Sequence, residues 1–163
     1  MANIYETRFL SPIGLIIIRG DASGIASLDF VKKEPVRSGA AQPARDTPQV
    51  LRDCLTQLDE YFRGERTSFS VPLNLPGTPF QKKVWKALLR IPYGETVTYK
   101  DIASAIGNAR ATRAVGGANH RNPVSIIVPC HRVVGSDGRL TGYGGGLDKK
   151  AWLLAHERQH ARD

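Results

Sequence analysis

Hydrophobic residues alternate with polar ones near the start of the chain and later change to a helical spacing. Three short apolar runs occupy Tyr5–Phe9, Gly14–Arg19 and Ile25–Val31, and the turn residues Ser11-Pro12-Ile13-Gly14 separate the first two. Partly alternating runs of this length, bounded by turn residues, are typical of β-strands. The pattern therefore predicts a strand-rich first segment.

A helix is predicted after a stretch rich in Pro, Gly, Ala, Ser and charge between residues 32 and 46, which we interpret as a surface loop. Thr47 as N-cap and Pro48 at the first helical position predict its start. Gly64 predicts its end. Its apolar residues follow a 3.6-residue period at Val50, Leu51, Cys54, Leu55, Leu58, Tyr61 and Phe62. Cys54 is therefore expected to be a buried structural residue.

The second half has mainly helical patterns. Ser68–Gly77 is Pro- and Gly-containing and is interpreted as a connector. Thr78 and Gln81 then form a capping box at the start of a helix that is expected to reach about Arg90. Further helices are predicted over Thr98–Gly107, Ala111–Asn119 and Asp148–His160. The expected fold is α/β (α+β), with a small strand-rich α/β domain over residues 1–76 and a mostly helical domain over residues 77–163.

Two of these helices have the proportions of a helix-turn-helix of the winged-helix kind. Thr98–Ile106 and Ala111–Asn119 are joined across Gly107-Asn108. Arg110 and Arg113 lie near the start of the second helix, where recognition helices meet a DNA groove. That helix is also rich in small residues, which either let its backbone approach DNA closely or let two helices pack tightly. The pattern leaves both interpretations open.

Charge is divided unequally along the chain. Residues 1–76 hold nine Lys or Arg and nine Asp or Glu, whereas residues 77–163 hold fourteen and six, so the second half carries the whole net charge of +8. A strongly basic domain beside a neutral one favours a polyanionic partner, with nucleic acid as the first candidate. The alternative is a basic surface that only increases solubility.

Composition argues against export, membrane insertion and metal binding. No apolar run approaches the eighteen or so residues that span a bilayer. The first residues have no basic segment followed by an apolar one, so a cytoplasmic protein with reduced thiols is expected. The two cysteines and four histidines form no zinc-binding pattern. His156 and His160 have i, i+4 spacing, but we interpret them as surface residues and predict neither metal nor cofactor.

Cys130 is the clearest candidate for chemistry. It follows the apolar run Ile126–Val128, and Pro129 ends a predicted strand there because proline has no N–H for a sheet. Cys130 is therefore expected at a turn or at the start of a short helix. Free N–H groups and the neighbouring His131 and Arg132 would favour its thiolate form. The alternative is a small buried hydrophobic residue.

The run from Asn122 to Val134, which contains Pro129-Cys130-His131-Arg132, resembles the active-site signature of the O6-alkylguanine-DNA alkyltransferases, also called methylated-DNA–protein-cysteine methyltransferases. The resemblance covers residues 77–158 almost continuously, and residues 1–76 match only loosely. It extends through the segments Gly77–Gln81, Ile91–Thr96, Arg113–Ala118, Tyr143–Gly146 and Trp152–Glu157.

The resemblance implies a suicidal DNA-repair reaction. Cys130 would attack the alkyl carbon on guanine O6 in an SN2 step and keep it as a stable thioether, so each molecule reacts once. His131 would act as base, through a water, and Glu157 would orient it. Tyr99 would crowd a phosphate, drive rotation of the nucleotide, and donate a proton to the purine. Asn122 would brace the turn that holds Cys130.

The resemblance also implies the remaining site residues and the partner. Arg113 would fill the gap left by the extruded base. The partner would be double-stranded DNA bearing O6-alkylguanine, with O4-alkylthymine as a further substrate, bound by a monomer. Besides Arg113 and Tyr99, the implied DNA contacts are Arg110, Ala114, Gly116, Gly117 and Arg121. The implied substrate pocket is Ser125, Val128, Pro129, Tyr143, Gly144 and Gly145.

Two other classes of function remain open at this point. One is a helix-turn-helix DNA-binding regulator that uses Cys130 as a reactive thiol, and such a protein normally binds as a dimer. The other is a cysteine hydrolase built on Cys130, His131 and Glu157, which would turn over many times. The first would share with a repair protein a steep dependence of binding on salt. A hydrolase of a small neutral substrate would not.

Overall fold

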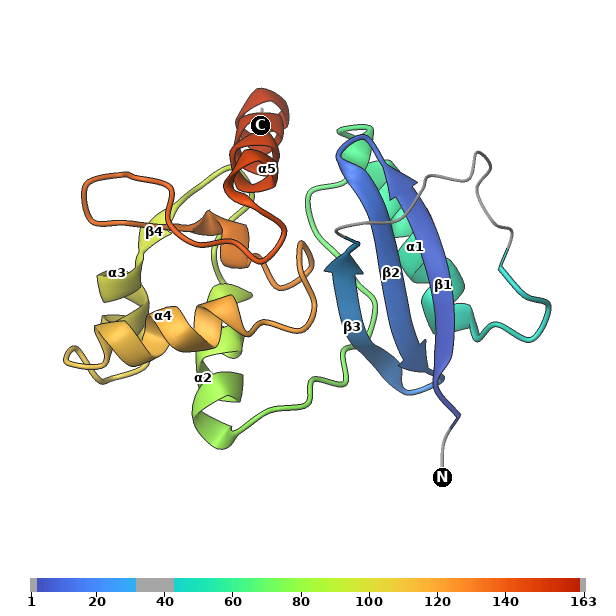
Figure 1. Ribbon diagram of the computed structural model, residues 1–163, viewed down its shortest axis with the longest axis horizontal. Helices are drawn as coiled ribbons and strands as arrows, with labels where there is room; N and C mark the ends of the chain where they lie inside the picture. Colours follow the sequence, from blue (N-terminus) through green and yellow to red (C-terminus); the bar gives the residue numbers. More distant parts are fainter. Residues whose placement is uncertain (1–2, 32–42, 162–163) are drawn as a thin grey trace. The chain divides into compact units, whose positions relative to one another are not determined.

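The computed structural model describes residues 3–31 and 43–161, and the chain divides into two compact units, Met1–Pro76 and Gly77–Asp163 (Figure 1). The predicted loop between residues 32 and 46 falls mostly outside the described residues. No helix within the two described stretches is both long enough and apolar enough to cross a membrane.

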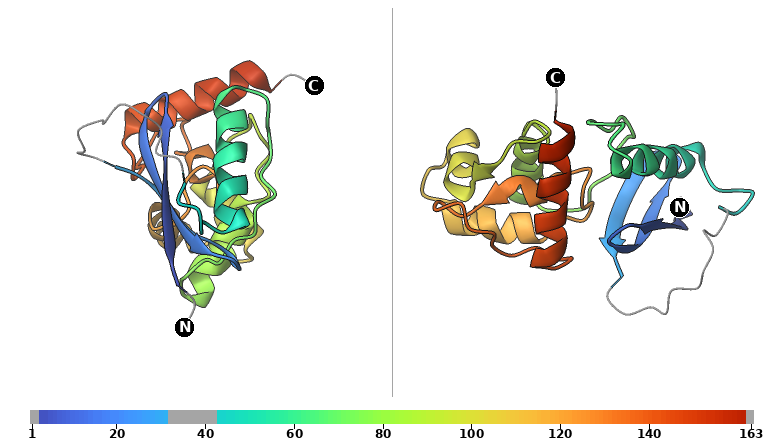
Figure 2. Two further views of the ribbon diagram at one scale, coloured as in Figure 1. Left: turned by 90° about the vertical axis from the view of Figure 1, so that its right-hand side faces the viewer. Right: turned by 90° about the horizontal axis from the view of Figure 1, so that it is seen from above.

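Within residues 3–31 and 43–76, the first unit is a three-stranded antiparallel sheet with one helix on it. The strands are β1 (Tyr5–Ser11), β2 (Gly14–Asp21) and β3 (Gly24–Phe30), in the order β1-β2-β3. Helix α1 (Gln49–Phe62) covers one face of the sheet (Figure 2). Alternate residues of the central strand face this helix, as the two-residue period of a strand requires. The core between the sheet and α1 includes Ile16, Ile18, Leu28, Leu51, Cys54 and Leu58, all with no exposed surface. The predictions of three strands, of the helix and of a buried Cys54 are therefore confirmed.

The start of α1 differs from the prediction by one residue. Pro48, and not Thr47, is the cap residue, and no side chain caps the helix. The Pro48 carbonyl accepts from the amides of Leu51 and Arg52, so the helical bonds begin one residue later than the Thr-Pro pattern indicates. The predicted end is confirmed, because Gly64 has a left-handed φ of 77° two residues after the last helical residue.

The second unit is a cluster of four helices: α2 (Pro79–Leu88), α3 (Tyr99–Ala105), α4 (Thr112–His120) and α5 (Leu147–His160). The predicted capping box of Thr78 and Gln81 starts α2, which ends at Leu88, two residues before the predicted Arg90. A second capping box, of Thr98 and Asp101, starts α3. The predicted helices therefore all form.

A short parallel ladder joins two distant segments of this unit. Strand β4 (Val97–Thr98) pairs with β5 (Val133–Val134), with Val97 opposite Val133 and Thr98 opposite Val134. The first residue of α3 follows β4 directly, and β5 directly follows the 3-10 helix η1 (Cys130–Arg132). The ladder therefore fixes the start of α3 next to the segment that contains Cys130.

The strand predicted for Ile126–Val128 is wrong. These residues form a turn in which Ile126 has a φ of 72°, a conformation that β-branched residues rarely adopt. The amide of Ile127 donates to the Ser125 carbonyl and the amide of Val128 donates to the Val124 carbonyl. A buried tight turn and a buried strand both require a run of apolar residues. Hydrophobicity alone therefore did not distinguish the two.

Helices α3 and α4 are consecutive, as the helix-turn-helix prediction requires, and they pack on each other. Val115 and Ala118 of α4 are buried, whereas Arg113, Ala114 and Gly117 are exposed. A Cβ added to Gly117 would meet no atom within 4 Å. Helix packing therefore accounts for Ala118 but not for the small residues on the outer face.

Candidate active site

Cys130 begins the 3-10 helix η1 and is held by a turn that Asn122 braces. The amide side chain of Asn122 donates to the Val128 carbonyl at 2.8 Å, and its oxygen accepts from the Val124 amide at 3.0 Å. The Cys130 amide donates to the same Val128 carbonyl at 2.8 Å. Cys130 is only 5% exposed, and its position at the start of a short helix was predicted.

The expectation that Cys130 is a thiolate in the resting protein is wrong. Burial raises the pKa of its thiol, and this outweighs the Asn122 hydrogen bond and the Lys150 charge, both of which lower it. Arg132, the cation that the sequence suggested, is bonded elsewhere. The thiol therefore holds its proton until a base accepts it.

His131 lies in the interior with one nitrogen bonded and one available. Its Nε2 lies 2.7 Å from a Glu157 oxygen, whereas its Nδ1 has no hydrogen-bond partner among the described residues. Burial lowers the pKa of His131 more than the Glu157 carboxylate raises it, so the ring is neutral near pH 7. A neutral ring that donates from Nε2 has its lone pair on Nδ1, where it can accept a proton.

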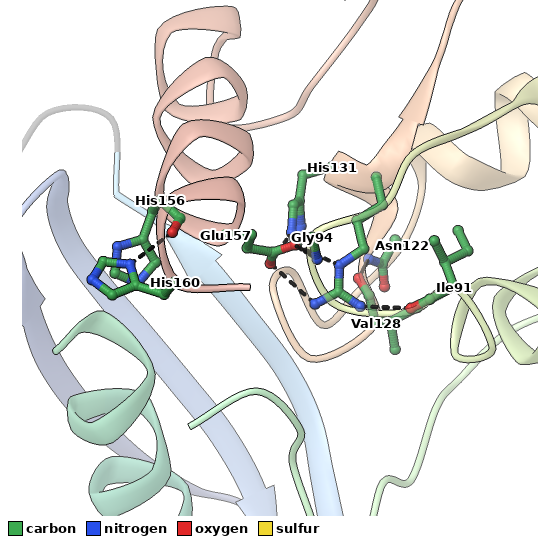
Figure 3. A network of polar contacts seen from close by, with 9 residues as sticks. Ile91, Gly94, Asn122, Val128, His131, His156, Glu157 and His160 are labelled. Atoms are coloured by element: carbon green, nitrogen blue, oxygen red, sulfur yellow. Dashed lines mark hydrogen bonds and ion pairs between the residues drawn. The ribbon is translucent and has the colours of Figure 1, made fainter. Parts of the chain in front are cut away.

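Glu157 is the centre of a buried polar network (Figure 3). Arg132 donates to its two oxygens from Nε at 2.7 Å and from Nη2 at 3.0 Å, and the Gly94 amide donates at 3.3 Å. The remaining Nη1 of Arg132 donates to the Ile91 carbonyl at 2.7 Å. Burial acts to raise the pKa of Glu157, but its bonds to His131 and Arg132 together hold it well below its usual value. Glu157 is therefore an anion throughout the physiological range.

Tyr99 is the first residue of α3, and its hydroxyl lies 2.7 Å from that of Thr141. Its ring lies against α4, because a Cβ on Gly116 would be 3.9 Å from Tyr99 Cδ1. The other predicted DNA contacts lie on α4 and its flanks. Of these, Arg110, Arg113, Ala114, Gly117 and Arg121 are exposed, and Gly116 is half-buried.

Three of the predicted pocket residues lie close to the thiol. Tyr143 is 8% exposed, hydrogen-bonds Ser125 and interacts electrostatically with Cys130, while burial raises the pKa of its phenol well above the usual value. Val128 accepts the Asn122 and Cys130 bonds described above. Pro129 is the buried residue before Cys130. Gly144 and Gly145 lie further along the loop; Gly144 is exposed, and a Cβ on it would meet no atom within 4 Å.

Lys150 is a functional candidate that the sequence reasoning missed. It has no exposed surface, its ammonium donates to the Thr141 carbonyl at 2.6 Å, and it interacts electrostatically with Cys130. Burial lowers its pKa, and the Cys130 charge opposes that shift. A signal was present, because Lys150 and Glu157 are seven residues apart and share the buried face of α5 with Leu153 and Leu154. Charged residues at such positions indicate a polar site.

The described residues contain no cluster of three or more His, Cys, Asp or Glu side chains that could hold a metal ion. The rings of His156 and His160 lie with their centroids 4.4 Å apart and are tilted by 48° (Figure 3). His156 also stacks on Trp152, with centroids 4.7 Å apart. His160 Nδ1 donates to the His156 carbonyl at 2.7 Å. The expectation that both are surface residues is wrong for His156, which packs against Trp152 and is only 7% exposed, while His160 is half-buried.

Comparison with known proteins gives matches over both units. Residues 79–159 match the family described as 6-O-methylguanine DNA methyltransferase, DNA binding domain, and residues 4–75 match its ribonuclease-like domain. A methylated-DNA–protein-cysteine methyltransferase of Methanosarcina barkeri is 51% identical over 93% of this chain and 96% of its own length. The crystal structure of a Mycobacterium tuberculosis O6-methylguanine methyltransferase is similar, with a TM-score of 0.85, 45% identity and 98% and 96% of the two chains covered. The structure of Mycobacterium tuberculosis OGT in complex with DNA matches with a TM-score of 0.84, 45% identity and coverage of 95% and 93%.

Proposed function

The chain belongs to the 6-O-methylguanine DNA methyltransferase family, and we propose that Cys130 is the residue at which it accepts the methyl group. The reaction is DNA repair by transfer of a methyl group to a cysteine of the protein itself. The chain has two cysteines. Cys54 lies in the core of the first unit, where burial raises its pKa to about 12, so it is a poor nucleophile.

The observation that carries this proposal is the charge arrangement behind Cys130. Burial, helped by the Arg132 charge, keeps His131 uncharged beside Glu157, and its Nδ1 has no partner among the described residues. A buried thiol with a raised pKa needs such a base. We propose that one water links the thiol to His131 Nδ1, because that buried nitrogen finds no hydrogen-bond partner in the described part of the chain.

In the proposed step the thiol proton moves through this water to His131 as the Cys130 sulfur attacks the methyl carbon. The bond between sulfur and carbon forms while the bond between carbon and guanine O6 breaks, and its electron pair stays on the purine. The phenol of Tyr99 donates a proton to the purine as this charge develops. Glu157 stabilises the imidazolium that His131 becomes. The product is a thioether with no good leaving group, so each protein molecule reacts once.

The second unit is the proposed DNA-binding part. The exposed side of α4 offers Arg113, Ala114 and Gly117, which combine positive charge with a surface that a duplex can approach closely. Arg113 fills the space of the extruded base, and Tyr99 favours its rotation. Extrusion costs a few kcal/mol, and least for a damaged base. The proposed partner is a duplex with O6-alkylguanine, bound by a monomer in the cytoplasm.

Intact-protein mass spectrometry tests the proposal directly. After mixing with a duplex containing one O6-methylguanine, the mass should rise by one methyl group per molecule, and peptide mapping should locate it at Cys130. Cys130→Ser should bind the same duplex without a mass change, and Cys54→Ser should react like the wild-type protein. A methyl group on Cys54, or none on a protein that binds the lesion tightly, would contradict the assignment.

A further inference from the structure

Thr141 makes contacts with two elements that the reaction uses. Its hydroxyl lies 2.7 Å from the hydroxyl of Tyr99, forty-two residues earlier in the chain. Its carbonyl accepts a bond of 2.6 Å from the Lys150 ammonium, which interacts with the Cys130 thiol. One loop residue therefore links the start of α3 to the buried cation beside the nucleophile.

The loop around Thr141 is anchored on both sides of this residue. The Gly135 amide donates to the Arg139 carbonyl at 2.9 Å, which closes a tight turn before Thr141. The residues on both sides of Tyr143 are glycines at 142 and 144–146, and glycine backbones choose among many conformations. After Thr141, Tyr143 is buried, hydrogen-bonds Ser125, and its carbonyl accepts from the Gly146 amide at 2.9 Å. The two bonds of Thr141 hold the stretch between these anchors.

We propose that Thr141 is a positioning residue for methyl transfer, holding the Tyr99 phenol through its hydroxyl and the Lys150 ammonium through its carbonyl. This inference rests on the proposed function, because Tyr99 acts as a proton donor only in that reaction. When the phenol proton points to the purine, the phenol oxygen must accept at its other side. The Thr141 hydroxyl is in place to donate there.

This donation has a consequence in the transition state. The phenol oxygen gains negative charge as its proton moves to the purine, and a hydroxyl donor already aimed at that oxygen stabilises the charge without rearrangement. The Thr141 carbonyl plays a different part, because it holds the Lys150 ammonium where it favours the thiolate of Cys130. The hydroxyl should therefore affect only the reaction with DNA, and the carbonyl should affect the thiol at all times.

Thr141→Val separates the two contacts, since it removes the hydroxyl, keeps the shape of the side chain and retains the carbonyl. Thr141→Ser restores a hydroxyl. Ser136→Ala is the matched control, because it removes an exposed hydroxyl from the same loop. For each variant we would measure the single-turnover rate of methyl transfer at saturating duplex, the Kd for the duplex, and the rate at which iodoacetamide alkylates Cys130 without DNA.

Thr141→Val should slow methyl transfer about threefold to tenfold, the change that corresponds to one hydrogen bond of ordinary net strength. Its Kd and its iodoacetamide rate should match those of the wild-type protein. Thr141→Ser should recover most of the rate, and Ser136→Ala should lose none. In a Tyr99→Phe background, Thr141→Val should cause no further loss, because the two hydroxyls act as one unit.

Three results would overturn the inference while leaving Cys130 as acceptor. The first is an unchanged transfer rate in Thr141→Val. The second is a loss that persists in full in the Tyr99→Phe background. The third is a parallel change in the iodoacetamide rate, which would mean that the substitution merely loosens the loop.

For the carbonyl contact, Lys150→Met should slow alkylation of Cys130 by iodoacetamide, and an unchanged rate would contradict that part of the inference. A wild-type protein that transfers no methyl group would instead contradict the proposed function itself.

Discussion

Arg132 binds Glu157 at two points, with Nε 2.7 Å from Oε1 and Nη2 3.0 Å from Oε2, and both side chains are buried. An arginine stays cationic at every relevant pH, so Arg132 balances the negative charge of Glu157 without His131 having to be protonated. Burial is the main reason that the pKa of His131 is lowered, and the Arg132 charge adds to it, so His131 is kept as a neutral base. The guanidinium thus acts on the protonation state of the imidazole and makes no hydrogen bond with the thiol.

Arg132→Met should therefore change both stability and pH dependence. Leaving Glu157 buried without its partner should lower the free energy of unfolding by about 3–5 kcal/mol. The Arg132 charge also lowers the pKa of His131, so its loss should raise that pKa and move the acid limb of the pH–rate profile to higher pH. Urea unfolding and single-turnover rates from pH 5 to 8 would measure the two effects.

The matched control is Arg63→Met, which breaks an exposed pair with Asp59 at 2.9 Å. Such exposed i, i+4 pairs contribute about 0.3–0.5 kcal/mol. Equal destabilisation by the two substitutions would contradict the importance of the buried pair.

Stability should fall as the pH falls below the ordinary His value of 6.5, because the folded protein lowers the pKa of His131. The unfolded chain then binds a proton that the folded protein does not, so the contribution of His131 is complete above pH 6.5 and is lost below it. The slope is at most about 1.4 kcal/mol per pH unit. Chemical unfolding at a series of pH values gives the free energy of unfolding against pH. Below pH 6.5 this free energy should change less steeply for His131→Asn than for the wild-type protein, and identical slopes would refute the prediction.

Asn122→Ala should weaken the turn that holds Cys130. It removes the donor to the buried Val128 carbonyl and the acceptor for the Val124 amide, at a cost of about 1–3 kcal/mol in unfolding free energy. Asn122→Asp keeps the acceptor but adds a negative charge near the thiol, which should raise the Cys130 pKa further. Methyl transfer should slow in both variants and most in Asn122→Asp at neutral pH; a normal rate in either would argue against the brace.

Gly117→Ala should increase stability and weaken DNA binding together. An alanine at this exposed helical position meets no atom within 4 Å, and replacing glycine inside a helix stabilises by about 0.5–1 kcal/mol. The added methyl group would stand on the surface that we propose contacts the duplex. Thermal unfolding and duplex titration would measure both. Thr56→Ala, on the exposed side of α1, should leave DNA binding unchanged; a similar loss there would disprove the role of Gly117.

Local signals were predicted well from the sequence, because they depend on residues close in the chain. The capping box of Thr78, the start of a helix at Thr98 and the glycine at the end of α1 are examples. The turn at Ile126 was predicted as a strand, since burial from all sides gives the same apolar run in both structures. The error at Thr47 was of one residue, because a proline next to a threonine permits either as the cap.

The electrostatic part of the site depends on tertiary contacts that no local pattern carries. Arg132 was taken as a cation for the thiol, but it turns toward Glu157 on α5 and toward the Ile91 carbonyl. Lys150 was not considered, although it is the cation that interacts with Cys130. The pairing of His131 with Glu157 was inferred only through the family resemblance, since twenty-six residues separate them. Which charge lies beside which group is decided by how α5 packs on η1.

The parallel pairing of β4 with β5 has a consequence for how this protein can evolve. Its register joins Val97 to Val133 and Thr98 to Val134, one residue from Tyr99 on one strand and one residue from Arg132 on the other. The ladder is made of main-chain atoms, so apolar replacements at Val133 or Val134 leave the register intact. An inserted or deleted residue would move one strand by about 3.3 Å and turn its side chains to the opposite face. Val133 and Val134 can therefore be replaced by other apolar residues, but neither segment can change in length.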